Sequence, residues 1–299
     1  MAKALENKWI VLCILALTWG SVFILIKKTL LVFNPYEIGA LRMVISGIVL
    51  VKFGWPALRK MSKETMIWVG VAGFFGNFFP TFLFPIAQTQ VSSSMAGILD
   101  TLVPVFILVI GFLFFGIKSK LIQIIGAVVG FSGAALLLYF SESNSEETQF
   151  LYALLIVLAT ACYGLSALIV KYRLGHVPSL QLSSGAISLW LLPSLIALTF
   201  SGFFTNFEPN PPTWEAVGYM MILGVLGTAV CGVLYNKLIQ EVSPVFASTV
   251  TYLLPIVAVS WGLLDGERFT VWYLLGALLI LIGIYLIREP KKKPQHVPR

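Results

Sequence analysis

The sequence predicts an all-α integral membrane protein with ten transmembrane helices, arranged as two inverted repeats of five helices each. Three observations lead to this fold class: the composition, the length of the apolar segments and an internal repeat. Of the 299 residues, 58% are hydrophobic and only 11% are charged, and the mean hydropathy is +0.92. Soluble domains do not have this composition, so the chain is expected to fold in a lipid bilayer.

The apolar segments are mostly about twenty residues long, the length at which a helix crosses a hydrocarbon layer about 30 Å thick. Membrane-spanning strands need only about ten residues, and their side chains alternate between polar and apolar. The apolar segments of this chain are about twice as long and show no such alternation. Backbone polar groups in lipid must bond within the chain, so we expect helices throughout. The expected helices cover residues 9–30, 36–55, 65–86, 91–116, 121–140, 150–171, 180–202, 214–236, 245–264 and 271–288.

The second half of the chain repeats the first. The matching residues are shifted by 144 positions in the first helix and by 150 or 151 positions further on. The pairs are Trp19 with Tyr163, Gly20 with Gly164, residues 73–92 with residues 224–243, Pro104 with Pro255, Gly111 with Gly262 and Gly126 with Gly276. Chance matches of Gly and Pro are the alternative, but a register shared by several helices argues against chance.

Because each copy has an odd number of spans, the second copy enters the membrane in the opposite direction. Such inverted repeats are common in secondary transporters. We therefore expect a first five-helix repeat at 1–140, an extracytoplasmic linker at 141–149, a second repeat at 150–288 and a basic cytoplasmic tail at 289–299.

Basic residues indicate how the chain is oriented. Sixteen of the 20 Lys and Arg residues fall on the side that carries both termini, and the opposite side has only Lys27, Lys28 and Arg268. Short loops rich in Lys and Arg stay in the cytoplasm. We expect both termini to be cytoplasmic and the protein to cross a bacterial-type inner membrane many times. The tail is also suited to contact anionic lipid head groups.

Several short motifs follow one another in a characteristic order. They are Trp19-Gly20-Ser21 with Phe23, Pro35, Arg42 and Pro104 in the first half, and Pro255, Asp265-Gly266-Glu267, Gly276 and Gly283 in the second. In this respect the chain resembles, over almost its whole length, the EamA-like branch of the drug/metabolite transporter superfamily. The resemblance implies export of amino acids or similar metabolites by alternating access, with the substrate in a central cavity.

One departure from the family pattern concerns the end of the fourth helix of each repeat. Such proteins often carry an acidic residue there. Glu267 provides it in the second repeat, whereas the first repeat has Gly116 at the matching position. A role shared equally by the two halves is therefore not expected at this position.

The sequence contains no catalytic constellation. The two histidines, His176 and His296, fall in a loop and in the tail, and no HExxH, GxSxG or glycine-rich GK[ST] motif occurs. The three cysteines lack CxxC spacing and are interpreted as small apolar residues. We predict that the protein is not an enzyme and uses no cofactor or metal. No basic patch is interleaved with aromatic residues, so nucleic acid is not an expected partner.

Two charged residues lie deep inside predicted spans, Asp100 in the fourth helix and Arg42 in the second. An acid facing lipid costs about 2.5 to 3.5 kcal/mol, so Asp100 is expected to face the interior or a wet cavity. It is interpreted as a substrate or proton site. The alternative is a structural ion pair or polar contact with Arg42 that orients the helices, and the sequence leaves open whether the two residues meet.

The fourth helix also predicts the wall of a cavity. Its small and polar residues recur at positions that share one face of an α-helix, and mid-span prolines there free a carbonyl four residues earlier. Kinks that serve packing alone are the alternative. The predicted cavity residues are Trp19, Ser21, Arg42, Asn77, Ser93, Gly97, Asp100, Pro104, Tyr163, Ser248, Thr251, Tyr252 and Pro255. Glycines such as Gly126, Gly130, Gly133, Gly276 and Gly283 are interpreted as helix-packing positions instead.

The predicted function is export of small metabolites, amino acids or their analogues in the first place. A drug or nucleotide-sugar carrier of the same superfamily is the alternative, and a membrane-embedded enzyme and a channel are alternatives of a different class. The expected partners are a small-molecule substrate and membrane lipid, and the protein is expected to be a monomer or a homodimer.

Overall fold

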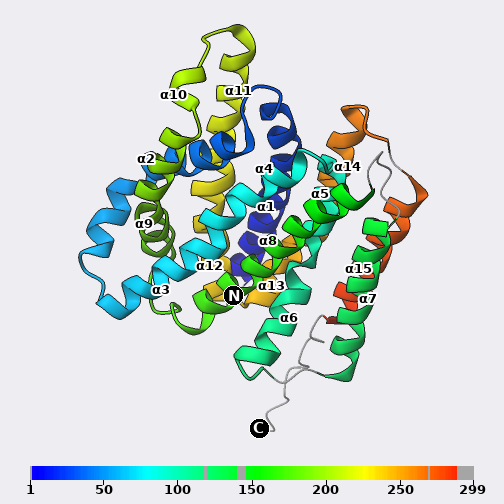
Figure 1. Ribbon diagram of the computed structural model, residues 1–299. Coiled ribbons are helices and arrows are strands. Elements are labelled where there is room, and N and C mark those ends of the chain that lie inside the picture. Colours follow the sequence, from blue (N-terminus) through cyan, green and yellow to red (C-terminus); the bar gives the residue numbers. More distant parts are fainter. Residues whose placement is uncertain (1, 118–119, 140–145, 269, 288–299) are drawn as a thin grey trace.

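The structure, a computed structural model, describes residues 2–117, 120–139, 146–268 and 270–287. Every element in these ranges is a helix (Figure 1). Of the linker predicted at 141–149, residues 146–149 belong to a helix, and the rest lies outside the described residues. The basic tail predicted at 289–299 lies outside them as well.

Within the described part of the chain, eight helical segments are long and apolar enough to cross a membrane. Four of them are single or interrupted helices of the first repeat: α1 (Ala2–Thr29), α2 (Pro35–Leu58), α3 with α4 (Lys63–Gly73, Phe79–Gln88) and α5 with α6 (Ser93–Leu99, Val103–Phe114). The other four are α8 (Glu146–Tyr172), α9 (Ser179–Phe200), α11 with α12 (Pro211–Met221, Cys231–Glu241) and α13 with α14 (Pro244–Ser248, Leu254–Leu264).

Three further helices complete the described fold. The apolar helices α7 (Leu121–Tyr139) and α15 (Val271–Ile287) are shorter, and α10 (Phe203–Asn206) is a single turn. An all-α membrane protein is therefore confirmed, with a helix at each of the ten predicted positions. The bounds differ most at α1, which begins at Ala2 rather than at residue 9. At its other large difference, α12 continues to Glu241 rather than ending at residue 236, because Gln240 is held by the carbonyls of Leu174 and Val177.

The spans begin where the sequence offers a capping side chain. Asn34 caps α2 in a capping box with Glu37, and Ser62 caps α3. Ser92 and its repeat mate Ser243 cap the fourth span of each repeat, accepting bonds from backbone N–H groups at 3.2 and 3.0 Å. Each cap satisfies a backbone donor that would otherwise be unpaired at a helix start.

The third and fourth spans of both repeats are interrupted at matching places. The third spans contain π-helical segments, η1 (Phe74–Phe78) and η3 (Ile222–Val230), and the fourth spans contain 3-10 turns, η2 (Asp100–Leu102) and η4 (Thr249–Tyr252). The 3-10 turns precede Pro104 and Pro255, which stand in the first turn of a new α-helix. The carbonyl expected to be freed at Asp100 instead accepts the N–H of Val103.

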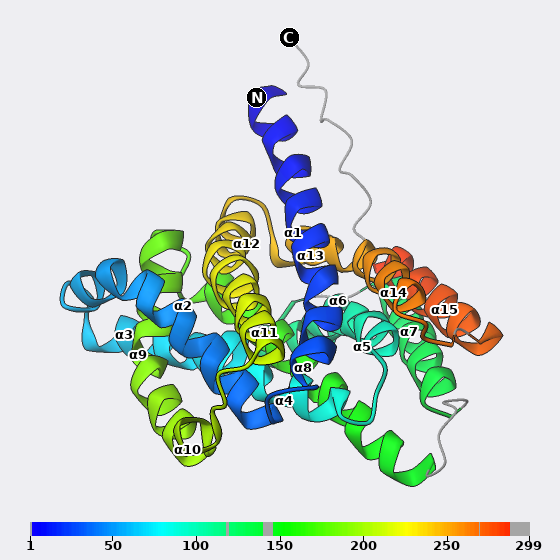
Figure 2. The ribbon, with the colours of Figure 1, turned by 90° about the horizontal axis from the view of Figure 1, so that it is seen from above.

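Two helix pairs form opposite edges of the molecule, α2 with α9 and α7 with α15 (Figures 1 and 2). The second pair packs through glycines. An added Cβ at Gly126 would lie 2.5 Å from the carbonyl oxygen of Gly283, and one at Gly133 would lie 2.7 Å from that of Gly276. The prediction that these glycines are packing positions is confirmed, because only a hydrogen side chain allows the two backbones to come so close.

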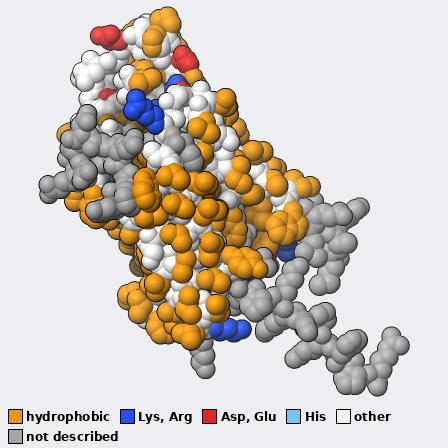
Figure 3. Space-filling model, turned by 90° about the vertical axis from the view of Figure 1, so that its right-hand side faces the viewer, with side chains coloured by type: hydrophobic (Ala, Val, Ile, Leu, Met, Phe, Trp, Pro, Cys, Tyr) orange, Lys and Arg blue, Asp and Glu red, His pale blue; other side chains and the backbone are white. Residues whose placement is uncertain are grey.

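The outer surface is largely apolar. Figure 3 shows hydrophobic side chains over the middle of one face, with acidic side chains gathered at its upper end. Exposed residues such as Leu17, Ile48, Leu192 and Ile256 lie in the middle parts of spans. In a bilayer these side chains face lipid, so their exposure is not an exposure to water.

Candidate functional site

A cavity lies between the two repeats. It contains about 1060 Å³ of unfilled space, its mouth included. Both repeats contribute polar lining residues, which are Arg42, Asn77, Thr81, Asp100, Tyr163, Ser166, Thr228, Tyr235, Asn236 and Thr251.

The structure brings six of the predicted site residues to this cavity. They are Trp19, Arg42, Asn77, Asp100, Tyr163 and Thr251. Asn77 belongs to the π-helical segment η1, and Asp100 and Thr251 belong to the two 3-10 turns. The irregular segments of the third and fourth spans thus lie at the cavity wall. Non-α turns inside helices often mark functional sites.

Three predicted residues lie elsewhere, on α1 and α5. Ser21 is bonded to Trp261, whose Nε1 lies 2.9 Å from its hydroxyl, on the exposed side of α1. Ser93 belongs to a polar junction at one end of the molecule. Gly97 packs against α14, where an added Cβ would lie 2.3 Å from that of Ala258. None of the three lines the cavity.

The remaining four predicted residues also pack away from the cavity. Pro104, Ser248 and Pro255 are buried among helices. The hydroxyl of Tyr252 donates to the carbonyl of Ile284 at 3.3 Å, which directs it to α15. The prediction assumed one continuous α-helical face. The 3-10 turns change the angle between residues before and after them, so Pro104 and Pro255 do not share a face with Asp100 and Thr251. Ser93 and Gly97 stand before the turn and contact Glu267 and α14 instead, so the prediction of one cavity-lining face was wrong.

Asp100 and Arg42 face the same cavity without pairing. Their exposed fractions are 8% and 7%, and the ion pairs of the described residues do not include one between them. The Nε of Arg42 donates to the hydroxyl of Thr228 at 2.7 Å, which is the one hydrogen bond of the guanidinium among the described residues. The Oδ1 atom of Asp100 is buried and has no hydrogen-bond partner in the described structure. The alternative of a structural ion pair does not hold in this conformation.

Two aromatic pairs flank the charges and are related by the repeat. The rings of Trp19 and Tyr235 lie 4.9 Å apart, and those of Tyr163 and Phe84 lie 6.0 Å apart. Trp19 matches Tyr163, and Phe84 matches Tyr235, so each first helix meets the third span of the other repeat. The indole N–H of Trp19 also donates to the carbonyl of Gly227 in η3 at 2.8 Å.

Contacts among the ends of helices distinguish the two ends of the molecule. The end at which α1 starts is called the near end, and the end at which α1 finishes is called the far end. At the near end, Trp9 at the start of α1 meets Phe246 at the start of α13, with ring centroids 5.7 Å apart. Lys171 at the end of α8 bonds to the end of α12 there. At the far end, Lys27 near the end of α1 bonds to Glu267 after α14.

The cavity extends toward the near end. Its lining includes Val170, Leu182 and Ile239, which stand close to the near ends of α8, α9 and α12. Toward the far end the lining stops at Phe23 and Phe84, whose rings lie 5.8 Å apart. These two rings separate the cavity from the far end.

Sequence reasoning missed several lining residues. Thr228 is the repeat mate of Asn77, which was predicted, so the repeat carried a signal for it. Tyr235 is the mate of Phe84, which was not itself predicted to line the cavity. Asn236 has proline as its mate and gave no such signal. Its amide donates to the hydroxyl of Ser183 at 2.9 Å across to α9.

Known proteins resemble this chain over nearly its full length. A transporter of Archaeoglobus fulgidus is 23% identical over 290 residues, covering 94% of this chain and 98% of its own. The inner membrane transporter YedA of Escherichia coli is 27% identical over 289 residues, covering 91% and 90%. One solved crystal structure has a TM-score of 0.63 at 16% identity, covering 94% of this chain and 96% of its own, which supports the fold alone.

The model of the EamA-like transporter family matches the chain twice, over residues 7–139 and 150–288. The two matches correspond to the two repeats and cover most of the chain. The relatives named above are transporters, which agrees with a protein that has a cavity between two halves. This chain belongs to the EamA-like transporter family.

Proposed function

We propose that the protein is a secondary transporter that exports amino acids or closely related small zwitterions by alternating access. The observation that carries the proposal is that two buried charged side chains, Arg42 and Asp100, line the cavity and form no ion pair with each other. A zwitterion brings the two complementary charges with it.

The chemistry of the two groups suits the ends of an amino acid. Arg42 lines the cavity, and among the described residues only its Nε forms a hydrogen bond, which leaves the two Nη atoms available. A guanidinium can bind a carboxylate in a bidentate way. The free Oδ1 of Asp100 is an acceptor for an ammonium group. Each charge left unpaired in a buried site is costly, and a bound zwitterion removes both costs at once.

The cavity lining argues against a nucleotide sugar. Among the described lining residues, Arg42 is the one cationic side chain. A diphosphate needs several cationic side chains or N–H donors around it, and phosphate sites usually contain a cluster of such groups. The aromatic rings of Trp19, Tyr163 and Tyr235 instead suit the apolar side chain of a small substrate.

The proposed topology has ten spans. We add α7 and α15 to the eight longer segments, because both are strongly apolar and pack along each other at one edge of the bundle. With the basic loops in the cytoplasm, the near end is cytoplasmic. The cavity then faces the cytoplasm, which is the side from which an exporter is loaded.

Alternating access is supported by the matching interruptions of the third and fourth spans. Interrupted helices at the interface of inverted repeats are typical sites of substrate binding and of movement in secondary transporters. The π-helical and 3-10 segments occupy such places in both repeats. They can absorb changes in backbone angles when one half moves against the other.

A ligand screen of the purified protein tests the proposal. Amino acids are expected to raise the unfolding midpoint, since a ligand that binds the native state stabilises it. For each stabilising amino acid, the amine without the carboxylate and the acid without the amine serve as matched controls and are expected to have little effect. Proteoliposomes that contain the protein and are loaded with the same amino acid should then show efflux of that amino acid. Stabilisation mainly by nucleotide sugars or lipophilic cations would contradict the proposal.

A further inference from the structure

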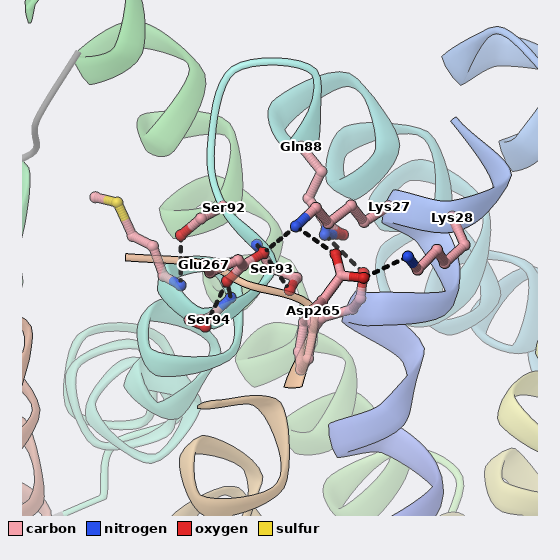
Figure 4. A network of polar contacts seen from close by, with 10 residues as sticks. Lys27, Lys28, Gln88, Ser92, Ser93, Ser94, Asp265 and Glu267 are labelled. Atoms are coloured by element: carbon pink, nitrogen blue, oxygen red, sulfur yellow. Dashed lines mark hydrogen bonds and ion pairs between the residues drawn. The ribbon is translucent and has the colours of Figure 1, made fainter. Parts of the chain in front are cut away.

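A polar junction closes the far end of the molecule. It consists of Lys27 and Lys28 at the end of α1, Ser93 and Ser94 at the start of α5, and Asp265 and Glu267 after α14 (Figure 4). The junction ties the first helix to the fourth spans of both repeats.

Glu267 is the centre of this junction. Its Oε1 accepts bonds from the N–H and hydroxyl of Ser93 at 3.0 and 2.7 Å, and its Oε2 accepts those of Ser94 at 3.0 and 2.5 Å. Lys27 donates to Oε1 at 2.9 Å and forms a second ion pair with Asp265 at 2.7 Å. Hydrogen bonds to an ionised group are the stronger kind, and one carboxylate here accepts five.

These carboxylates are ionised at neutral pH. Burial raises the pKa of Glu267, but the hydrogen bonds from Ser94, Lys27 and Ser93 outweigh it and bring the pKa below its ordinary value. The hydrogen bonds from Lys27 and Lys28 lower the pKa of Asp265. Because both pKa values are lowered, the contribution to stability is lost only when the pH falls through these acidic values.

The helices at the junction fit closely. An added Cβ at Gly262 of α14 would lie 2.0 Å from the hydroxyl oxygen of Ser94. Beside the junction, Gln88 donates to the carbonyl of Phe23 at 2.9 Å (Figure 4), and the rings of Phe23 and Phe84 end the cavity. The charged junction therefore stands over an aromatic layer, and both lie between the cavity and the far end.

The junction related to this one by the repeat has different chemistry. At the near end, Gly116 stands where Glu267 stands at the far end. Pro244 and Val245 replace the two serines, so neither hydroxyl is present and one backbone N–H is missing. Lys171 matches Lys27 but donates to the backbone carbonyls of residues 239, 240 and 242 at 3.1 to 3.3 Å.

We propose that this junction is the far-end gate of the transporter and that Glu267 is the residue that holds it closed. The gate is one-sided: at its repeat mate Gly116 replaces the carboxylate, and Pro244 and Val245 replace the two serine hydroxyls, so the resting protein closes at the far end and stays accessible from the near end. This inference uses the alternating access of the proposed function and is independent of the substrate's identity.

Thiol labelling in intact cells and inverted vesicles tests the gate. A version without Cys13, Cys162 and Cys231 carries one reporter, Val22→Cys, on the cavity wall beside the aromatic layer. An impermeant reagent should label the reporter from the near end only. Glu267→Gln keeps the shape of the side chain but removes its charge. The rate of labelling from the far end should then rise about tenfold or more, because the charge-assisted hydrogen bonds that favour the closed state are lost.

A matched control uses another acid of the described far-end loops. Glu208 is exposed and has no ion pair among the described residues, so Glu208→Gln should leave labelling unchanged. If Glu267→Gln does not fold, the pair Ser93→Ala and Ser94→Ala removes two donors and should act in the same direction. An unchanged far-end rate in a variant that elutes as a single folded species would overturn the gate. Labelling needs no substrate, so this result and the ligand screen can fail separately.

Discussion

At the scale of single residues, the buried charges are the most informative feature of the chain. Arg42 is held by one hydrogen bond from Nε to Thr228, and Asp100 leaves one oxygen without a partner. Neither arrangement is the most stable one for an isolated membrane protein, since a direct ion pair or two apolar side chains would cost less. Unpaired groups of this kind are expected where a ligand completes the site.

The first prediction concerns the charge of Asp100. Asp100→Asn keeps the volume, and because Oδ1 accepts no hydrogen bond in the described structure, the variant should fold with an unfolding midpoint equal to or above that of the wild type. Transport of a zwitterion should fall by about tenfold to a hundredfold, as expected when one charged contact is lost. Efflux from proteoliposomes and a thermal scan measure the two effects.

The control for Asp100→Asn is Thr199→Ala. Thr199 is an exposed residue of a span, and among the described residues its hydroxyl bonds to the carbonyl of Leu195 in its own helix alone. The substitution Thr199→Ala removes a polar group from a span without changing the cavity, so both transport and the unfolding midpoint should stay near those of the wild type. Normal transport by the Asp100 variant would show that this carboxylate has no part in binding.

At the scale of elements, the third and fourth spans explain which parts of the site the sequence could predict. Trp19 and Tyr163 were found because the repeat superposes them, and both line the cavity. The prediction of one polar face on the fourth helix was wrong at Pro104 because a 3-10 turn begins at Asp100, and wrong at Ser93 and Gly97 because these residues contact Glu267 and α14. Residue spacing alone does not reveal such a turn, since it depends on packing between the two repeats.

The helices themselves were predictable because bilayer thickness sets the length of an apolar segment. The far-end junction was not. Lys27 and Glu267 are separated by 240 positions and belong to different repeats. The sequence showed only that Glu267 lacks an acidic mate. That asymmetry was the correct signal, but its partners depend on how the helices are arranged.

The prediction at this scale concerns the contact between α7 and α15. In Gly126→Ala the new Cβ would lie 2.5 Å from a backbone oxygen of α15, so the helices must move apart. Overpacking of this kind costs about 1 to 3 kcal/mol, which should lower the unfolding midpoint. Gly218→Ala is the matched control, because nothing lies within 4 Å of an added Cβ there. It should be neutral or slightly stabilising, since Ala favours a helix. Equal midpoints for the two variants would contradict close packing of the pair.

At the scale of the whole molecule, the distribution of charge bears on orientation. Lys27 and Lys28 are basic residues on the side expected to be outside, where such residues are rare. The structure gives a reason for the exception: both are paired with Asp265 or Glu267. Paired in this way, the two lysines add little to the charge that determines orientation, and the basic loops of the near end dominate.

The last prediction follows from this charge distribution: the near end is cytoplasmic, and both termini are cytoplasmic as well. In the version without native cysteines, Glu208→Cys in the loop before α11 should react with an impermeant reagent added to intact cells. Lys60→Cys, in the turn between α2 and α3, should react only after the membrane is opened. Lys60 and Glu208 are both exposed, so a reagent can reach either site. Lys60 is replaced rather than the neighbouring Ser62, because the side chain of Ser62 caps α3.

An odd number of spans between the two sites is required for opposite labelling. Equal labelling would therefore mean that one of the helices from α3 to α9 does not cross the membrane. A reversed pattern would keep the fold but invert the protein, and the cavity would then face outward, which would contradict loading from the cytoplasm and favour uptake.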